Sequence, residues 1–89
     1  MKKRNDIQLE NFLYINLCTI ERVPIIVVYK NPLDYPNKYV ARLWGIKNNA
    51  TNMVVIKDSL EEIRKAIPKG MQRLKATSKD DPVIVETYI

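Results

Sequence analysis

The stretch from Met53 to Gly70 constrains the fold of this chain more than any other. It begins with a β-branched apolar run, Val54-Val55-Ile56, passes through a helix-capping signal, and continues as a short amphipathic segment. β-branched residues favour strands, and a serine followed three residues later by a glutamate is typical of a helix start. The stretch therefore predicts a strand that leads directly into one helix.

The helix has two candidate starts and a clear end. Ser59 with Glu62 matches a capping box, and Asp58 with Glu61 offers the same arrangement one residue earlier; the sequence does not distinguish them. Proline and glycine at positions 68 and 70 end the segment. A helix of about nine residues is only ~13 Å long. Its apolar stripe, which we expect to pack on a sheet, consists of Leu60, Ile63, Ala66 and Ile67.

Three further segments are predicted to be strands. Residues 25–29 are a continuous apolar, mostly β-branched run, which is typical of a central strand covered on both faces. Residues 38–44 alternate after a loop with two prolines, so the two segments predict an antiparallel hairpin with a long connection. Residues 83–89 form a last strand after Pro82.

The N-terminal quarter is harder to interpret. Residues 12–20 are apolar but scatter around a helical wheel, so a strand is favoured over a helix there. We expect residues 1–22 to be an N-terminal extension with one possible extra strand, and residues 23–89 to be a single domain. The fold class is then α+β, with a mostly antiparallel sheet of three to five strands, one short helix, and the order (β)βββαβ.

Composition argues against an enzyme. The 89 residues contain no histidine, the commonest general acid–base residue and metal ligand. The single cysteine, Cys18, excludes an internal disulfide and a Cys-x-x-Cys site, and its apolar neighbours predict a small buried side chain. Two glycines leave no room for a phosphate-binding glycine loop. We therefore expect no catalytic residue, no metal site and no cofactor.

Charge gives one candidate nucleic-acid surface. The formal net charge is +5, from 15 basic and 10 acidic residues, which is a mild bias. A basic segment spans residues 64–79, and the alternative of weak nucleic-acid binding uses its cations. A solvated helix end is the favoured interpretation of this segment, because Asp80 and Asp81 partly neutralise it. The candidate phosphate-contacting residues are Arg64, Lys65, Lys69, Arg73 and Lys75.

A count of layers points to a partner surface. The strands at 25–29 and 83–89 are apolar on both faces, and one short helix covers only part of one face. The other face needs a cover, either the 12–20 segment or another subunit. We therefore expect a homodimer, with Tyr35, Trp44 and Tyr88 as candidate partner-binding residues. Tyr35, between two prolines, is expected to be the exposed aromatic. Glu86, which interrupts the last apolar run, is expected to face outward.

No membrane anchor is expected. The longest apolar run, residues 23–29, is far shorter than the ~20 residues that span a bilayer. The basic start is followed by acidic and amide residues without a signal-peptide cleavage site. These features predict a cytoplasmic protein.

Three segments together resemble the HicB-type antitoxin family. They are Ile25-Ile26-Val27-Val28-Tyr29, then Tyr39-Val40-Ala41-Arg42, then Val54-Val55-Ile56-Lys57-Asp58-Ser59-Leu60-Glu61-Glu62. The resemblance covers residues 23–67 and implies a reduced ribonuclease-H-like arrangement of three strands, a helix and a last strand. It also implies an antitoxin-like partner of a small toxin. The chain departs from the family pattern at Trp44-Gly45-Ile46-Lys47-Asn48-Asn49 and in its early helix stop, and these departures weaken the implication of toxin and operator binding while leaving the implied strand order in place.

The leading hypothesis from the sequence is that the protein is a non-enzymatic protein-interaction module, which associates with itself through a sheet face or edge. Nucleic-acid binding by the basic segment and an antitoxin-like role are the alternatives.

Overall fold

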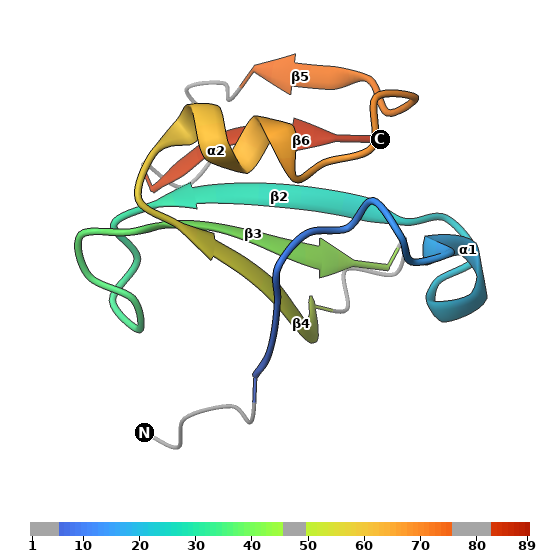
Figure 1. Cartoon of the computed structure of the whole chain (residues 1–89), viewed down its shortest axis with the longest axis horizontal. Helices are drawn as coiled ribbons and strands as arrows, with labels where there is room; N and C mark the ends of the chain where they lie inside the picture. The colour runs from blue at the N-terminus through green and yellow to red at the C-terminus, as the bar shows by residue number, and fades with distance from the viewer. Residues whose placement is uncertain (1–5, 46–49, 76–82) are drawn as a thin grey trace.

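The computed structural model of the chain describes residues 6–45, 50–75 and 83–89. The strands within these ranges form one six-stranded sheet in the order β1-β4-β3-β2-β6-β5 (Figure 1). In chain order the elements are β1 (Ile7–Leu9), α1 (Leu17–Ile20), β2 (Ile25–Lys30), β3 (Tyr39–Trp44), β4 (Ala50–Lys57), α2 (Leu60–Lys65), β5 (Arg73–Lys75) and β6 (Ile84–Tyr88). The α+β class is confirmed, and the sheet is larger than the predicted three to five strands.

The predicted hairpin forms the centre of the sheet. β2 and β3 pair antiparallel from Ile25 opposite Trp44 to Lys30 opposite Tyr39, and β6 pairs with the other edge of β2. β2 is therefore central, as its continuous apolar run predicts. β1 pairs with β4 in parallel, so the sheet is mixed.

Of the two short strands at the ends of the sheet, β5 was not predicted, whereas β1 lies within residues 1–22, where one extra strand is an alternative in the sequence analysis, at residues 7–9 and not at 12–20. β1 and β5 have three residues each, and every residue of β5 is exposed. Their sequences, Ile-Gln-Leu and Arg-Leu-Lys, are too short for an alternating pattern to indicate a strand, because such a pattern needs four or more residues.

The hydrophobic core lies between α2 and one face of the sheet, called here the α2 face. Ile26 and Val28 of β2 point to it, and Ile63 on α2 is fully buried against the sheet. Ser59 caps α2 by accepting a hydrogen bond from the Glu62 N–H at 3.2 Å, so the capping box starts at Ser59. The helix has six residues, not nine, because the chain leaves the helical path at Ala66, two residues before Pro68.

The prediction of a strand at residues 12–20 is wrong. This segment crosses the α2 face beside the helix and ends in α1 (Figure 1). The Phe12 N–H donates to the Ala66 carbonyl at 2.8 Å, and the Phe12 ring is fully buried. Asn16 caps α1 by accepting from the Cys18 N–H. Cys18 itself is exposed, so its predicted burial is also wrong.

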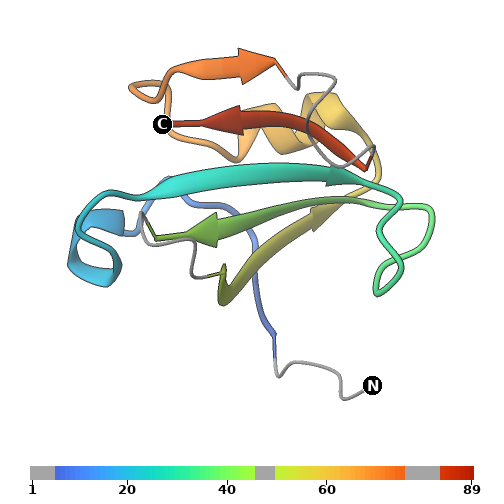
Figure 2. The ribbon, with the colours of Figure 1, turned by 180° about the vertical axis from the view of Figure 1, so that it is seen from behind.

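The opposite face of the sheet carries no helix in the part of the chain that the structure describes (Figure 2). We call it the open face. Side chains alternate along each strand, so Ile25, Val27 and Tyr29 of β2 point to this face while Ile26 and Val28 point to the core. Neither α1 nor α2 is long and apolar enough to cross a membrane.

Candidate interaction surface on the open face

The open face contains a depression across three neighbouring strands, and the described residues that line it carry no charge. It has a volume of about 230 Å³ and is lined mainly by apolar side chains. The register places Trp44 of β3 opposite Ile25 of β2, with β6 on the other side of β2. The lining residues are Ile25, Val27, Tyr29, Trp44, Gly45, Ile84 and Thr87. Apolar sheet area of this kind is typical of a partner surface.

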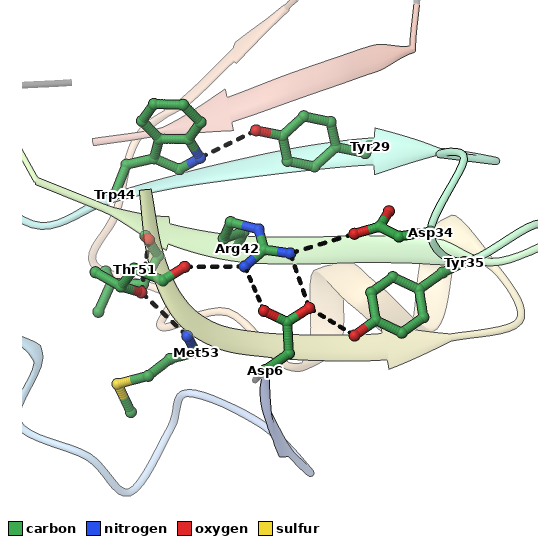
Figure 3. Close-up of polar contacts among 9 residues, drawn as sticks. Asp6, Tyr29, Asp34, Tyr35, Arg42, Trp44, Thr51 and Met53 are labelled. Carbon is green, nitrogen blue, oxygen red and sulfur yellow. Dashed lines mark hydrogen bonds and ion pairs between the residues drawn. The ribbon is translucent and has the colours of Figure 1, made fainter. Parts of the chain in front are cut away.

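Trp44 and Tyr29 form one rim of this depression. The Trp44 indole Nε1 donates a hydrogen bond to the Tyr29 hydroxyl at 3.0 Å, and both side chains lie along the open face (Figure 3). Their polar ends are therefore bonded to each other, and the rings present apolar area to a partner. A partner can cover this pair without leaving the indole N–H unpaired.

Beside this rim, a buried ion pair between Arg42 and Asp6 covers part of the open face. Arg42 of β3 is 6% exposed, and its guanidinium makes two contacts with Asp6, at 2.9 and 3.1 Å (Figure 3). It also donates to the Thr51 carbonyl at 2.9 Å and lies 3.6 Å from the Asp34 carboxylate. Burial alone would lower the pKa of Arg42, but Asp6 and Asp34 outweigh it and the pKa is raised.

Tyr35 completes this cover from the loop between β2 and β3. Its hydroxyl donates to Asp6 at 2.6 Å. Burial, and then the hydrogen bond to Asp6, raise the pKa of Tyr35 to about 12. The loop is held by Asn31, whose Oδ1 accepts from the Asn37 N–H at 2.7 Å; both asparagines have positive φ, which asparagine tolerates.

The three candidate partner-binding residues do not lie together. Trp44 is on the open face, as described. Tyr35 is half-buried and bonded to Asp6, so the prediction that it is an exposed aromatic is wrong. Tyr88 is 7% exposed and belongs to the core on the α2 face. The lining residues that come from β2 could have been predicted from the sequence. Residues 25–29 are all apolar or aromatic, so β2 must present such side chains to both faces of the sheet.

The five basic candidates are divided by the fold. Arg64 on α2 and Arg73 on β5 converge on Glu86 of β6, with Arg64 Nε at 3.0 Å and Arg73 Nε at 3.6 Å from its oxygens. Lys75 is paired with Glu86 across the β5–β6 register, so it shares their side of the sheet. Lys65 instead contacts Glu61 at 3.6 Å on the exposed helix surface. Lys69 is exposed in the turn after α2.

Glu86 is not outward-facing, contrary to the sequence interpretation. Its side chain is 3% exposed and points to the α2 face. A buried carboxylate needs cationic partners, and the two arginines supply them. The hydrogen bond to Glu86 also raises the pKa of Arg64. The sequence around Glu86 could not predict that its side chain is buried, because its cationic partners come from β5 and α2.

Within residues 6–45, 50–75 and 83–89, no group of three or more acidic or cysteine side chains is placed to hold a metal ion. Asp80 and Asp81 lie outside the described residues.

Comparison of the chain with models of known protein families, with curated proteins and with solved structures finds no match. The resemblance to HicB-type antitoxins is therefore neither supported nor contradicted, and the antitoxin-like role stays a prediction.

Proposed function

We propose that this protein is a non-enzymatic interaction module that forms a homodimer by packing the open faces of two copies against each other. The observation that carries the proposal is the uncharged apolar depression over β2, β3 and β6, where the described residues provide no cover. Covering such area is favourable at roughly 25 cal/mol per Å² of apolar surface.

A second copy suits this surface for electrostatic reasons. Each chain carries a formal net charge of +5, so two copies repel each other at long range, and only a neutral contact adds no further repulsion to this. None of the described residues that line the depression is charged. Arg42, whose side chain lies beneath the open face, is already paired with Asp6. A two-fold dimer brings the same patch from both copies together, so a neutral patch opposes no like charges.

The dimensions are also suitable. The molecule measures 29 × 28 × 25 Å. The area of one face is therefore similar to the ~800 Å² that each partner contributes to an interface of standard size. Two twisted sheets pack face to face at a separation of about 10 Å, with their side chains interleaved. The dimer must therefore use most of the open face, including the Trp44 and Tyr29 rings.

Sedimentation velocity over a wide concentration range tests the proposal. We expect a dimer for the wild-type protein and a monomer for Val27→Glu, which puts a charge in the middle of the contact. The matched control is Leu33→Glu, because Leu33 is fully exposed in the loop outside the depression. The proposal is wrong if wild type is a folded monomer at all concentrations, or if both variants associate as wild type does.

A further inference from the structure

The outer edge of β5 carries backbone hydrogen-bonding groups that no strand of the described residues pairs with. β5 is the last strand in the sheet order, so within the described ranges only β6 pairs with it. Gln72 and Ile89 exchange two backbone hydrogen bonds, at 2.8 and 3.0 Å. Hydrogen-bonded and non-hydrogen-bonded pairs alternate along an antiparallel ladder. The next hydrogen-bonded pair is therefore Leu74 with Thr87.

It follows that the main-chain groups of Arg73 and Lys75 point away from β6. Each of these residues directs one N–H and one C=O outward, and all three residues of β5 are exposed. Edges of this kind accept an additional strand, either from another copy or from a different chain.

The side chains at this edge are strongly cationic on one face. Arg73 and Lys75 both point to the α2 face, where Arg64 stands beside them. Glu86 neutralises one of these three charges and leaves a net charge of about +2 at the edge. The two arginines are each 45% exposed, so their guanidinium groups remain accessible beside the buried carboxylate. Leu74, on the other face of the strand, is 40% exposed.

These charges discriminate between the candidate occupants. A second β5 edge would bring its own cations against this one, so pairing between copies is opposed. The phosphates of a nucleic acid offer acceptors to the two N–H groups but no donors to the two outward carbonyls. An extended peptide offers donors and acceptors in the alternation that the edge requires, and acidic side chains on it would meet the cations.

We propose that the outer edge of β5 binds an extended acidic peptide segment as a seventh strand, with alternating acidic, apolar and acidic residues. The acidic residues lie opposite Arg73 and Lys75 on the α2 face, and the apolar residue lies beside Leu74 on the open-face side. This site is separate from the homodimer contact proposed above and does not depend on it.

The probe is the capped peptide acetyl-Val-Glu-Val-Glu-Val-amide, titrated into the full-length protein at low salt and followed by amide NMR. We expect slowed hydrogen exchange at the Arg73 and Lys75 amides, whereas the Leu74 amide is protected with or without peptide because it bonds to β6. Replacing the glutamates of the probe by lysines, or methylating their backbone nitrogens, should abolish binding.

Two substitutions of Lys75 distinguish the contribution of the backbone hydrogen bond from that of the side-chain charge. Lys75→Ala removes the charge, and Lys75→Pro also removes the outward N–H, which the described fold does not use. We expect Lys75→Pro to bind the peptide about fivefold more weakly than Lys75→Ala, the effect of one hydrogen bond. Lys65→Glu is the matched control, because Lys65 is an exposed cation on α2 away from the β5 edge, and it should change the affinity less than twofold.

Three results would overturn the proposal. One is no exchange protection at Arg73 and Lys75 at saturating peptide, and another is equal binding by Lys75→Pro and Lys75→Ala. The third is preferential binding of a single-stranded oligonucleotide that weakens equally on reversal of Lys65, Lys69 or Lys75, which would indicate phosphate contact. Far-UV circular dichroism shows whether each variant is folded. The changes made to the peptide test the same contacts on the unmodified protein.

Discussion

The indole N–H of Trp44 donates a hydrogen bond to the hydroxyl oxygen of Tyr29 on the open face, at 3.0 Å. The two residues come from neighbouring strands, and their bond leaves a largely apolar surface in which the indole N–H needs no water or partner group. A surface prepared in this way can be buried at low desolvation cost. This relationship supports the proposal that the open face is an interface.

Removing the Tyr29 hydroxyl tests this role. Tyr29→Phe keeps the ring but deprives the Trp44 N–H of its acceptor when the face is buried. We expect the dimer dissociation constant to rise by roughly five- to thirtyfold, equivalent to about 1–2 kcal/mol. Sedimentation equilibrium measures the constant. Tyr14→Phe is the control, because Tyr14 is 89% exposed outside the depression; an equal effect of both variants would contradict the assignment.

The buried pair of Asp6 and Arg42 should dominate the stability of this part of the molecule. Asp6→Asn leaves the Arg42 charge buried with only the more distant Asp34 carboxylate, so we expect the free energy of unfolding to fall by about 3 kcal/mol. Urea unfolding measures it. Glu10→Gln removes an ion pair with Lys57 in which Glu10 is 87% exposed, and it should leave the urea midpoint unchanged.

Tyr35 predicts a loss of stability at alkaline pH. Its pKa is raised to about 12 in the folded protein, against about 10 in an unfolded chain. The folded state therefore holds this proton more tightly, and its contribution is complete below pH 10 and is lost between pH 10 and 12. Urea unfolding at pH 9 to 11.5 should show a steeper decline for wild type than for Tyr35→Phe. Parallel declines would mean that Tyr35 is not bonded to Asp6.

The start of α2 gives a local stability prediction. Ser59→Ala removes the acceptor of the Glu62 N–H and should lower the free energy of unfolding by about 1 kcal/mol. Ser59→Asp keeps an acceptor at the same position and should retain most of the stability. Thermal unfolding of the two variants measures the difference, and equal losses would place the cap elsewhere, for example at Asp58.

The central hairpin, β4 and α2 could be predicted from the sequence because their signals are local. β-branched runs and a capping serine act within a few residues of themselves, as in Val54-Val55-Ile56 and Ser59. The N-terminal segment could not be predicted in this way. Phe12 is buried because the main chain there bonds to Ala66, more than fifty residues away.

The site was predicted only in part for the same reason. The sequence predicts Trp44 as partner-binding, and the structure places it on the open face. The position of Tyr35 depends on Asp6, which is distant in the chain and has no local signal. Glu86 was misjudged because its burial depends on Arg64 and Arg73, contributed by two other elements. The continuous apolar run of β2 is the signal that the sequence does provide. It places apolar side chains on both faces of the sheet, so the second face is expected to need a cover.

Intermolecular nuclear Overhauser effects test the proposed interface most directly. In a mixed sample of labelled and unlabelled protein, the methyl groups of Val27 or Ile84 in one copy should show cross-peaks to the aromatic rings of Trp44 or Tyr29 in the other. A dimer whose intermolecular cross-peaks come only from α2 or β5, or a sample with none at millimolar concentration, would contradict the account.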